Sequence, residues 1–399
     1  MKTKRLNDLY RRFEDLLPPE EPLEMAKRLI AFQSENPPGM EAQISEYLEK
    51  WLSAEEFEVS RVLSPQGRPN LVATLRAKGG GKRLIYNGHM DVVPAGDPGV
   101  WTSPPYAPEI RSGRLYGRGA ADTKGGTAAF IYGAWLIKQA GLNLGHSELV
   151  LHLVSDEESG GTHGTGFLVT KGLAKADAAV VVEPTGMKIA TAEKGTLWYR
   201  ITIKGVAAHA AVPHLGVNAI EKMGKLLPRL KDMIGETRHP ILGEPTLSIG
   251  VISGGSKINT VADTCFIEVD RRCLPNEQTE VIEQRLEEIL ADFAKQQEIK
   301  LYKERLMFAE PSEIPANEKI VTISLSNIER VIGNRPEIFG ISGFTDARYY
   351  IRQAGTPAIL LGPGNMNQAH TTDEYVEVDQ LRRSALIFAL ITADFLDLE

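Results

Sequence analysis

Five separated segments of this chain each place a possible metal ligand directly after an apolar or glycine-rich run. The ligands are two imidazoles and three carboxylates, contributed by His89, Asp122, Glu158, Glu183 and His370. Such a set can hold two divalent metal ions about 3.5 to 4 Å apart, with one carboxylate bridging them. These residue types in this order point to a metal-dependent hydrolase.

Glu157 and Glu158 are the most informative of these signals. Adjacent residues at the end of a strand point to opposite sides, so one can bind metal while the other acts as a general base on the attacking water. An isolated Glu-Glu pair is more often part of a solvated acidic loop. Here the pair follows the apolar run 149–154 and precedes Ser-Gly-Gly at 159–161, which favours the functional interpretation.

Each of the other candidates also has an ordinary structural explanation. His89 fits a surface turn, although the nearby Asp91 carboxylate could accept the second imidazole N–H and fix the tautomer of His89. Asp122 fits a helix N-cap, Glu183 a strand-end carboxylate and His370 a structural loop histidine. The signals are weak one by one and strong together.

Length, composition and charge limit the classes of protein. With 399 residues, of which 42% are hydrophobic, the chain can bury two domain cores. A net charge of −7 argues against nucleic-acid and anionic-membrane partners, which reward clustered Lys and Arg. The only cysteines, Cys265 and Cys273, fall in or just after one expected strand, so neither a disulfide scaffold nor a cysteine-built zinc site is expected.

The first residues describe an amphipathic helix. Leu6, Leu9, Phe13 and Leu16 are interleaved with charged residues, unlike the apolar core of a signal peptide. No later segment is long and apolar enough to span a membrane. We therefore expect a cytoplasmic protein.

Strand and helix patterns alternate along most of the chain. Apolar runs at 84–86, 149–154 and 178–182 predict buried strands, and 127–140 predicts a helix packed on them. This is the pattern of an α/β domain with a largely parallel sheet, in which ligands gather beyond the carboxyl ends of the strands. The candidate ligands follow those strands.

The middle of the chain has a different pattern. From Leu197 to Lys204 apolar and polar residues alternate, which predicts a strand with one wetter face, and Pro228 should end or kink the helix that follows. The order βαββαβ fits a ferredoxin-like α+β domain. We therefore expect an inserted domain at 195–308 within a catalytic domain made of 1–194 and 309–399.

Together these segments resemble peptidase family M20, and within it the branch of acetylornithine deacetylases and succinyl-diaminopimelate desuccinylases. The resemblance covers nearly the whole chain and includes three further motifs, Trp101-Thr102-Ser103-Pro104-Pro105-Tyr106, Gly113-Arg114-Leu115-Tyr116-Gly117-Arg118-Gly119 and Thr345-Asp346-Ala347-Arg348. It implies a zinc-exopeptidase-like catalytic domain and an insert that serves as a dimerisation or lid domain.

The resemblance also implies how the ligands are shared between two metal ions. His89, Asp122 and Glu183 would hold one ion. Asp122, Glu158 and His370 would hold the other, so that Asp122 bridges the two. Zinc is favoured, and cobalt or manganese would also fit, because ligand type alone does not select among them.

Residues outside the ligand set receive roles by the same resemblance. Glu157 would be the general base, and Asp91 would orient the first histidine ligand. In dimeric relatives the equivalents of His209 and Asn259 reach the active site of the partner, where the histidine polarises the scissile carbonyl. Arg272 could clamp a substrate carboxylate bidentately. Each of these three residues also has an ordinary structural alternative. His209 could be a loop histidine whose hydrogen bonds are satisfied within the fold, Asn259 a turn residue, and Arg272 part of a structural ion pair.

The expected reaction is metal-dependent hydrolysis of a small anionic N-acyl amino acid, of N-succinyl-diaminopimelate or N-acetylornithine type, to a carboxylic acid and a free amine. Three positions depart from the family pattern, namely Thr123, Ala211 and Ala262, where Met, Ser and Pro are common. None of these departures removes a metal ligand, but they leave the identity of the substrate undetermined. An exopeptidase, dipeptidase or aminoacylase on the same metal centre is the nearest alternative. A non-catalytic, metal-stabilised binding protein is the remote one.

Overall fold

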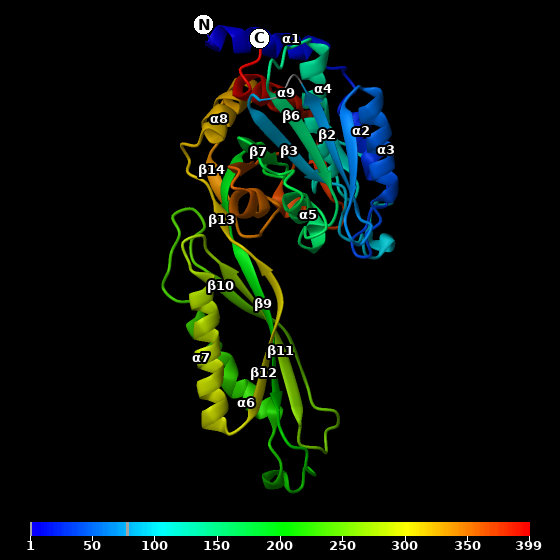
Figure 1. Ribbon diagram of the computed structural model, residues 1–399. Helices are drawn as coiled ribbons and strands as arrows, with labels where there is room; N and C mark the ends of the chain where they lie inside the picture. The colour runs from blue at the N-terminus through cyan, green and yellow to red at the C-terminus, as the bar shows by residue number, and fades with distance from the viewer. Residues whose placement is uncertain (1, 77–79) are drawn as a thin grey trace. The chain divides into compact units, whose positions relative to one another are not determined.

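The computed structural model describes residues 2–76 and 80–399, which form two compact units. The first unit comprises residues 1–191, 314–339 and 345–399, and the second comprises residues 192–313 and 340–344 (Figure 1). The sequence pattern placed the ends of the insert at 195 and 308. It did not indicate that 340–344 packs with the insert.

The first unit contains helices, a small separate sheet and most strands of a large mixed sheet. Its helices are α1 (Lys2–Leu16), α2 (Leu23–Ile30), α3 (Ala42–Ala54), α4 (Lys124–Gln139), α5 (Thr165–Thr170), α8 (Lys319–Ile332) and α9 (Val378–Phe395). In the described part of the chain the large sheet has nine strands, in the order β1 (Glu58–Leu63), β2 (Pro69–Arg76), β6 (Glu148–Val154), β3 (Arg83–His89), β7 (Ala178–Val181), β15 (Ala358–Leu360), β8 (Ile189–Glu193) and β13 (Ser312–Glu313), with β14 (Ile338–Ile341) paired to β8. The small sheet has the order β16 (Tyr375–Glu377), β5 (Arg114–Tyr116) and β4 (Glu109–Arg111).

The centre of the large sheet is parallel. Strands β6, β3, β7 and β15 run in the same direction, and the outer strands pair antiparallel. His89, the last residue of β3, lies opposite Val154, the last residue of β6. The carboxyl ends of the central strands therefore meet at one edge, as the predicted α/β class requires.

Neighbouring residues of β3 show what covers each face of this sheet. The Tyr86 hydroxyl donates to the carbonyl oxygen of Phe388 on α9 at 2.7 Å. On the opposite face, Asn87 Nδ2 donates to Thr165 Oγ1 on α5 at 2.8 Å. Helix α4 lies close against α9, because a Cβ on Gly133 would be only 2.7 Å from the Cβ of Phe388. Helices α4 and α9 therefore both cover the face of the sheet that carries Tyr86.

The second unit is a four-stranded antiparallel sheet with two helices. Its elements follow the predicted βαββαβ order, namely β9 (Gly195–Lys204), α6 (Ala219–Leu226), β10 (Thr246–Gly254), β11 (Thr264–Cys273), α7 (Thr279–Gln297) and β12 (Lys300–Ala309). The spatial order β10-β11-β9-β12 is that of a ferredoxin-like sheet (Figure 1). Apolar residues of β9 such as Tyr199 and Ile201 pack with α6 and α7, whereas Trp198 is exposed. Helix α6 ends at Leu226, two residues before Pro228, as predicted.

Within residues 2–76 and 80–399, no helix combines the length and the apolar character needed to cross a membrane.

Candidate metal centre

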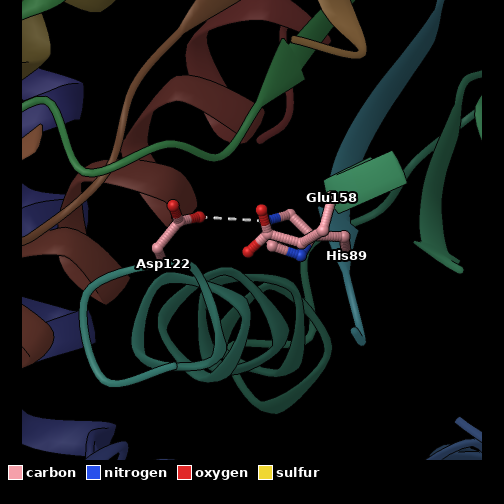
Figure 2. A group of neighbouring side chains, drawn as sticks. All are labelled: His89, Asp122 and Glu158. Carbon is pink, nitrogen blue, oxygen red and sulfur yellow. Dashed lines mark hydrogen bonds and ion pairs between the residues drawn. The ribbon is translucent and has the colours of Figure 1, made fainter. Parts of the chain in front are cut away.

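Three side chains converge at the carboxyl edge of the parallel strands. Ligand atoms of His89, Asp122 and Glu158 all lie within 4.8 Å of one another (Figure 2). His89 ends β3, Glu158 lies in the turn after β6, and Asp122 lies in the loop before α4. The approach of α4 to β3 depends on Gly88, since a Cβ there would be 2.5 Å from Thr127 Oγ1.

The two oxygens of Asp122 contact different imidazoles. Its Oδ1 lies 3.0 Å from His89 Nε2, and its Oδ2 lies 3.4 Å from His370 Nε2. His370 also lies 3.0 Å from Glu158 Oε2. Burial acts to raise the pKa of Asp122, but the hydrogen bonds from His370 and His89 lower it below its usual value. A carboxylate between two imidazoles has the arrangement expected of a bridging ligand.

Glu183 adds a third carboxylate from the end of β7. Its side chain is buried, and burial, together with the negative charges of Asp122 and Glu157, raises its pKa well above the usual value. Burial and the charge of Asp122 likewise raise the pKa of Glu158 to about 7. Carboxylates gathered in this way favour a cation, because each destabilises the ionised form of the others.

The Glu157 carboxylate lies beside this cluster but forms no hydrogen bond or ion pair with its side chains. Burial is the main cause that raises the pKa of Glu157 well above its usual value, and Asp346 and Glu158 act in the same direction. Across the described ranges of the chain, its carboxylate makes no hydrogen bond or ion pair with another side chain. A carboxylate without such a partner, beside a metal site, can accept and return a proton.

Asp91 orients its neighbours by a route that differs from the predicted one. His89 Nδ1 donates to the backbone carbonyl oxygen of Asp91 at 2.9 Å, whereas the Asp91 carboxylate lies 3.7 Å away. That carboxylate instead accepts from the backbone N–H groups of Glu157 (3.3 Å) and Glu158 (3.2 Å), and from Asn36 Nδ2 (2.8 Å). The acceptor of the His89 N–H is therefore the Asp91 carbonyl oxygen and not, as expected, its carboxylate. The short turn after His89 directs the carbonyl to the ring and the carboxylate to the next loop.

This hydrogen bond fixes the histidine tautomer that a metal requires. A carbonyl oxygen can only accept, so Nδ1 of His89 carries a proton, and Nε2, which faces Asp122, is the nitrogen left to bind a metal when the ring is neutral. A lone pair facing a carboxylate is unfavourable without a proton or a cation between them. The donor set of two imidazoles and buried carboxylates therefore fits divalent metal ions.

Two participants in this region were not identified from the sequence. Asn36 is buried and holds the Asp91 carboxylate. Glu374 is buried and accepts hydrogen bonds from the loop that contains Asp122. Both residues lie far along the chain from their contacts, and no local pattern distinguishes them.

The three remaining predicted residues belong to the second unit. His209 and Asn259 are exposed, and their loops are joined by a hydrogen bond from the Ala210 N–H to the Asn259 carbonyl oxygen at 3.0 Å. Arg272 forms an ion pair with Asp270 at 2.9 Å, so the structural alternative for this residue is present in the fold. Their roles towards substrate stay predictions.

The central α/β sheet, with imidazoles and carboxylates at its strand ends, defines a metallohydrolase type of fold and site. The sequence model of peptidase family M20/M25/M40 matches residues 85–394, and this chain belongs to that family. The family resemblance found in the motifs is thereby confirmed, as is the expectation of a hydrolase.

Curated relatives and a solved structure agree with this membership. Acetylornithine deacetylase of Proteus mirabilis (strain HI4320) is 32% identical over 341 residues, which cover 83% of this chain and 84% of the relative. Probable succinyl-diaminopimelate desuccinylase of Staphylococcus aureus (strain N315) is 27% identical over 409 residues, covering 94% and 98%. The Bacillus subtilis YXEP protein, described as a dinuclear metal binding peptidase from the M20 family, shares the fold with a TM-score of 0.72 at 15% identity, covering 98% of this chain and 99% of that one.

Proposed function

We propose that this chain is a di-metal amidohydrolase that deacylates a small anionic N-acyl amino acid, of N-succinyl-diaminopimelate or N-acetylornithine type. The observation that supports this function most is the position of Asp122 between His89 and His370. The Glu157 carboxylate lies beside them and has no hydrogen bond or ion pair with another side chain in the described ranges. The two curated relatives are named for these two reactions, and they supply the substrate class.

The proposed metal centre holds two ions. We assign His89, Asp122 and Glu183 to one ion, and Asp122, Glu158 and His370 to the other. The description of the Bacillus subtilis protein as dinuclear supports the number, and zinc is favoured over cobalt and manganese. When bound, the ions would polarise the substrate carbonyl and lower the pKa of water, which favours attack on an amide.

Glu157 is the proposed general base and acid. It takes a proton from the attacking water, and the water oxygen forms a bond to the amide carbon. The bond between carbon and nitrogen then breaks, and Glu157 gives the proton to the leaving nitrogen, so that a carboxylic acid and a free amine result. The hydrogen bonds from the Glu157 and Glu158 N–H groups to Asp91 hold this turn in place.

The second unit supplies the remaining proposed contacts. His209 Nδ1 accepts from the Ala211 N–H at 3.0 Å, so in the neutral ring Nε2 carries the proton and can donate to a carbonyl oxygen that gains negative charge. We propose that His209 and Asn259 act on the active site of a partner subunit in a homodimer, and that Arg272 binds a substrate carboxylate. A cytoplasmic location is part of the same proposal.

The proposal is tested by amine release from a substrate panel. Purified protein with zinc or cobalt is offered N-succinyl-diaminopimelate, N-acetylornithine, other N-acyl amino acids and dipeptides. We expect a clear preference for one of the first two. Turnover of dipeptides alone would move the chain to the peptidases of its family, and no metal-dependent turnover of any compound would favour a binding protein.

A further inference from the structure

A buried carboxylate outside the proposed ligand set joins the two loops that supply Asp122 and His370. Glu374 has no exposed surface and directly precedes β16. Its Oε1 accepts hydrogen bonds from the backbone N–H groups of Ala121 at 2.8 Å and Asp122 at 3.0 Å. Its Oε2 accepts from the Gly119 N–H at 3.1 Å. One carboxylate thus holds the loop that ends at the bridging aspartate.

Further hydrogen bonds connect the same two loops. Arg118 Nη1 donates to Glu374 Oε2 at 2.7 Å and to the carbonyl oxygen of Thr371, the residue after the second histidine ligand, at 3.1 Å. The Gly117 N–H donates to the Glu374 carbonyl oxygen at 3.0 Å. The loop that ends at the aspartate and the segment that begins at the histidine are therefore held together along their length.

The chemistry of these contacts makes the connection stiff. A buried carboxylate without partners is strongly destabilising, whereas hydrogen bonds to a charged group are roughly twice as strong as neutral ones. Two of the donors are the N–H groups of Ala121 and Asp122, so a displaced Glu374 carboxylate would rotate the backbone that directs the Asp122 side chain. Loss of a group that orients a metal ligand in this way typically lowers metal affinity or activity by about 10- to 100-fold.

Building on the proposed di-metal function, we propose that Glu374 is a positioning residue that sets the spacing between Asp122 Oδ2 and His370 Nε2. These two atoms lie 3.4 Å apart. Glu158 contacts the same imidazole but comes from the end of another strand, so it does not fix this spacing. Loss of Glu374 should therefore weaken the ion held by Asp122, Glu158 and His370 more than the other ion.

The test is a metal titration of the metal-free Glu374→Gln protein, by calorimetry with zinc and by the visible spectrum with cobalt. Glutamine keeps the size but replaces one acceptor oxygen by an amino group that faces N–H donors. We expect one ion to bind with nearly unchanged affinity and the other to bind about 10- to 100-fold more weakly, with an altered cobalt spectrum. Glu377→Gln is the matched control, because Glu377 is on β16 with its side chain 40% exposed and pairs with Arg114. It should bind both ions as the wild type does.

A folded Glu374→Gln protein that binds both ions with wild-type affinity would overturn the inference. If that variant does not fold, Glu374→Asp keeps the charge and withdraws it by one methylene group, and wild-type affinity for both ions there would overturn the inference equally. A purely structural role would lower the free energy of unfolding and leave both affinities unchanged. A wild-type protein that binds no second ion would instead contradict the proposed function, so the two failures are distinguishable.

Discussion

His370 Nε2 lies 3.0 Å from Glu158 Oε2, although 212 positions separate the two residues in the chain. Glu158 follows β6 and His370 follows β15, so only the assembled sheet brings them together. Hydrogen bonds with Asp122 and Glu158 raise the pKa of His370 to about 10. An imidazole between two carboxylates shows how strongly this position favours positive charge, which a metal ion would supply.

Replacing the proposed base should separate turnover from metal binding. Glu157→Gln removes a proton acceptor and changes no assigned ligand, so the metal content should equal that of the wild type. We expect kcat to fall by at least about 100-fold, the lower end of what a positioned general base contributes. Steady-state kinetics and elemental analysis of the same sample check both values. Turnover close to that of the wild type would remove Glu157 from the base role.

The turn that holds the paired glutamates should not tolerate a side chain at Gly161. This glycine has φ +68°, and a Cβ there would lie 2.3 Å from Asp346 Oδ1 and 3.0 Å from the Tyr349 ring. Gly172 has φ +71° with no atom within 4 Å of its Cβ position, and it is the matched control.

We expect Gly172→Ala to lower the free energy of unfolding by about 1–2 kcal/mol, from backbone strain alone. Gly161→Ala should lose about 1–3 kcal/mol more, because the new methyl group must displace packed atoms. Urea unfolding of both variants measures the difference. Equal losses would show that the contact with Asp346 relaxes without cost.

A buried histidine outside the metal centre should make the protein acid-sensitive. His152 Nδ1 lies 2.7 Å from the Tyr350 hydroxyl, and burial, aided by the positive charge of Arg83, lowers the pKa of His152 from 6.5 to about 3. Between pH 6.5 and about pH 3, His152 is protonated in the unfolded chain but stays neutral in the folded protein. Down to about pH 3 this group should therefore lower the free energy of unfolding by up to about 1.4 kcal/mol per pH unit.

The non-titrating variant His152→Gln isolates this effect from the titration of the metal centre. We expect the stability advantage of the wild type over the variant to shrink between pH 7.5 and pH 5, as measured by urea unfolding at each pH. An advantage that stays constant over that range would mean that His152 is protonated as easily in the folded protein as in the unfolded chain.

Features set by local sequence were predictable. The alternation that begins at Leu197 predicted the strand that became β9, and Pro228 predicted the end of α6. The ligands could be found because each follows an apolar or glycine-rich run, and apolar runs of this length predict strands wherever they lie in the chain. Parallel strands then bring their carboxyl ends to one edge without further information.

Features set by contacts between distant segments were not predictable. Whether His89 bonds the carbonyl or the carboxylate of Asp91 depends on the path of the turn and on Asn36, which holds the carboxylate elsewhere. Glu374 has no local signal, because its donors lie more than 250 positions away in the chain. For Arg272 the sequence allowed either a substrate clamp or an ion pair, and the fold provides Asp270 as a pairing partner.

The central claim is that two metal ions at this strand edge enable amide hydrolysis. The most direct measurement titrates metal-free protein with zinc or cobalt while amine release from the preferred N-acyl amino acid is followed. We predict no turnover without metal, a rise that is complete at two equivalents per chain, and at least about 100-fold lower turnover in Glu157→Gln, although that variant binds the same two ions. Full turnover by the metal-free protein, or saturation at one equivalent, would contradict the claim.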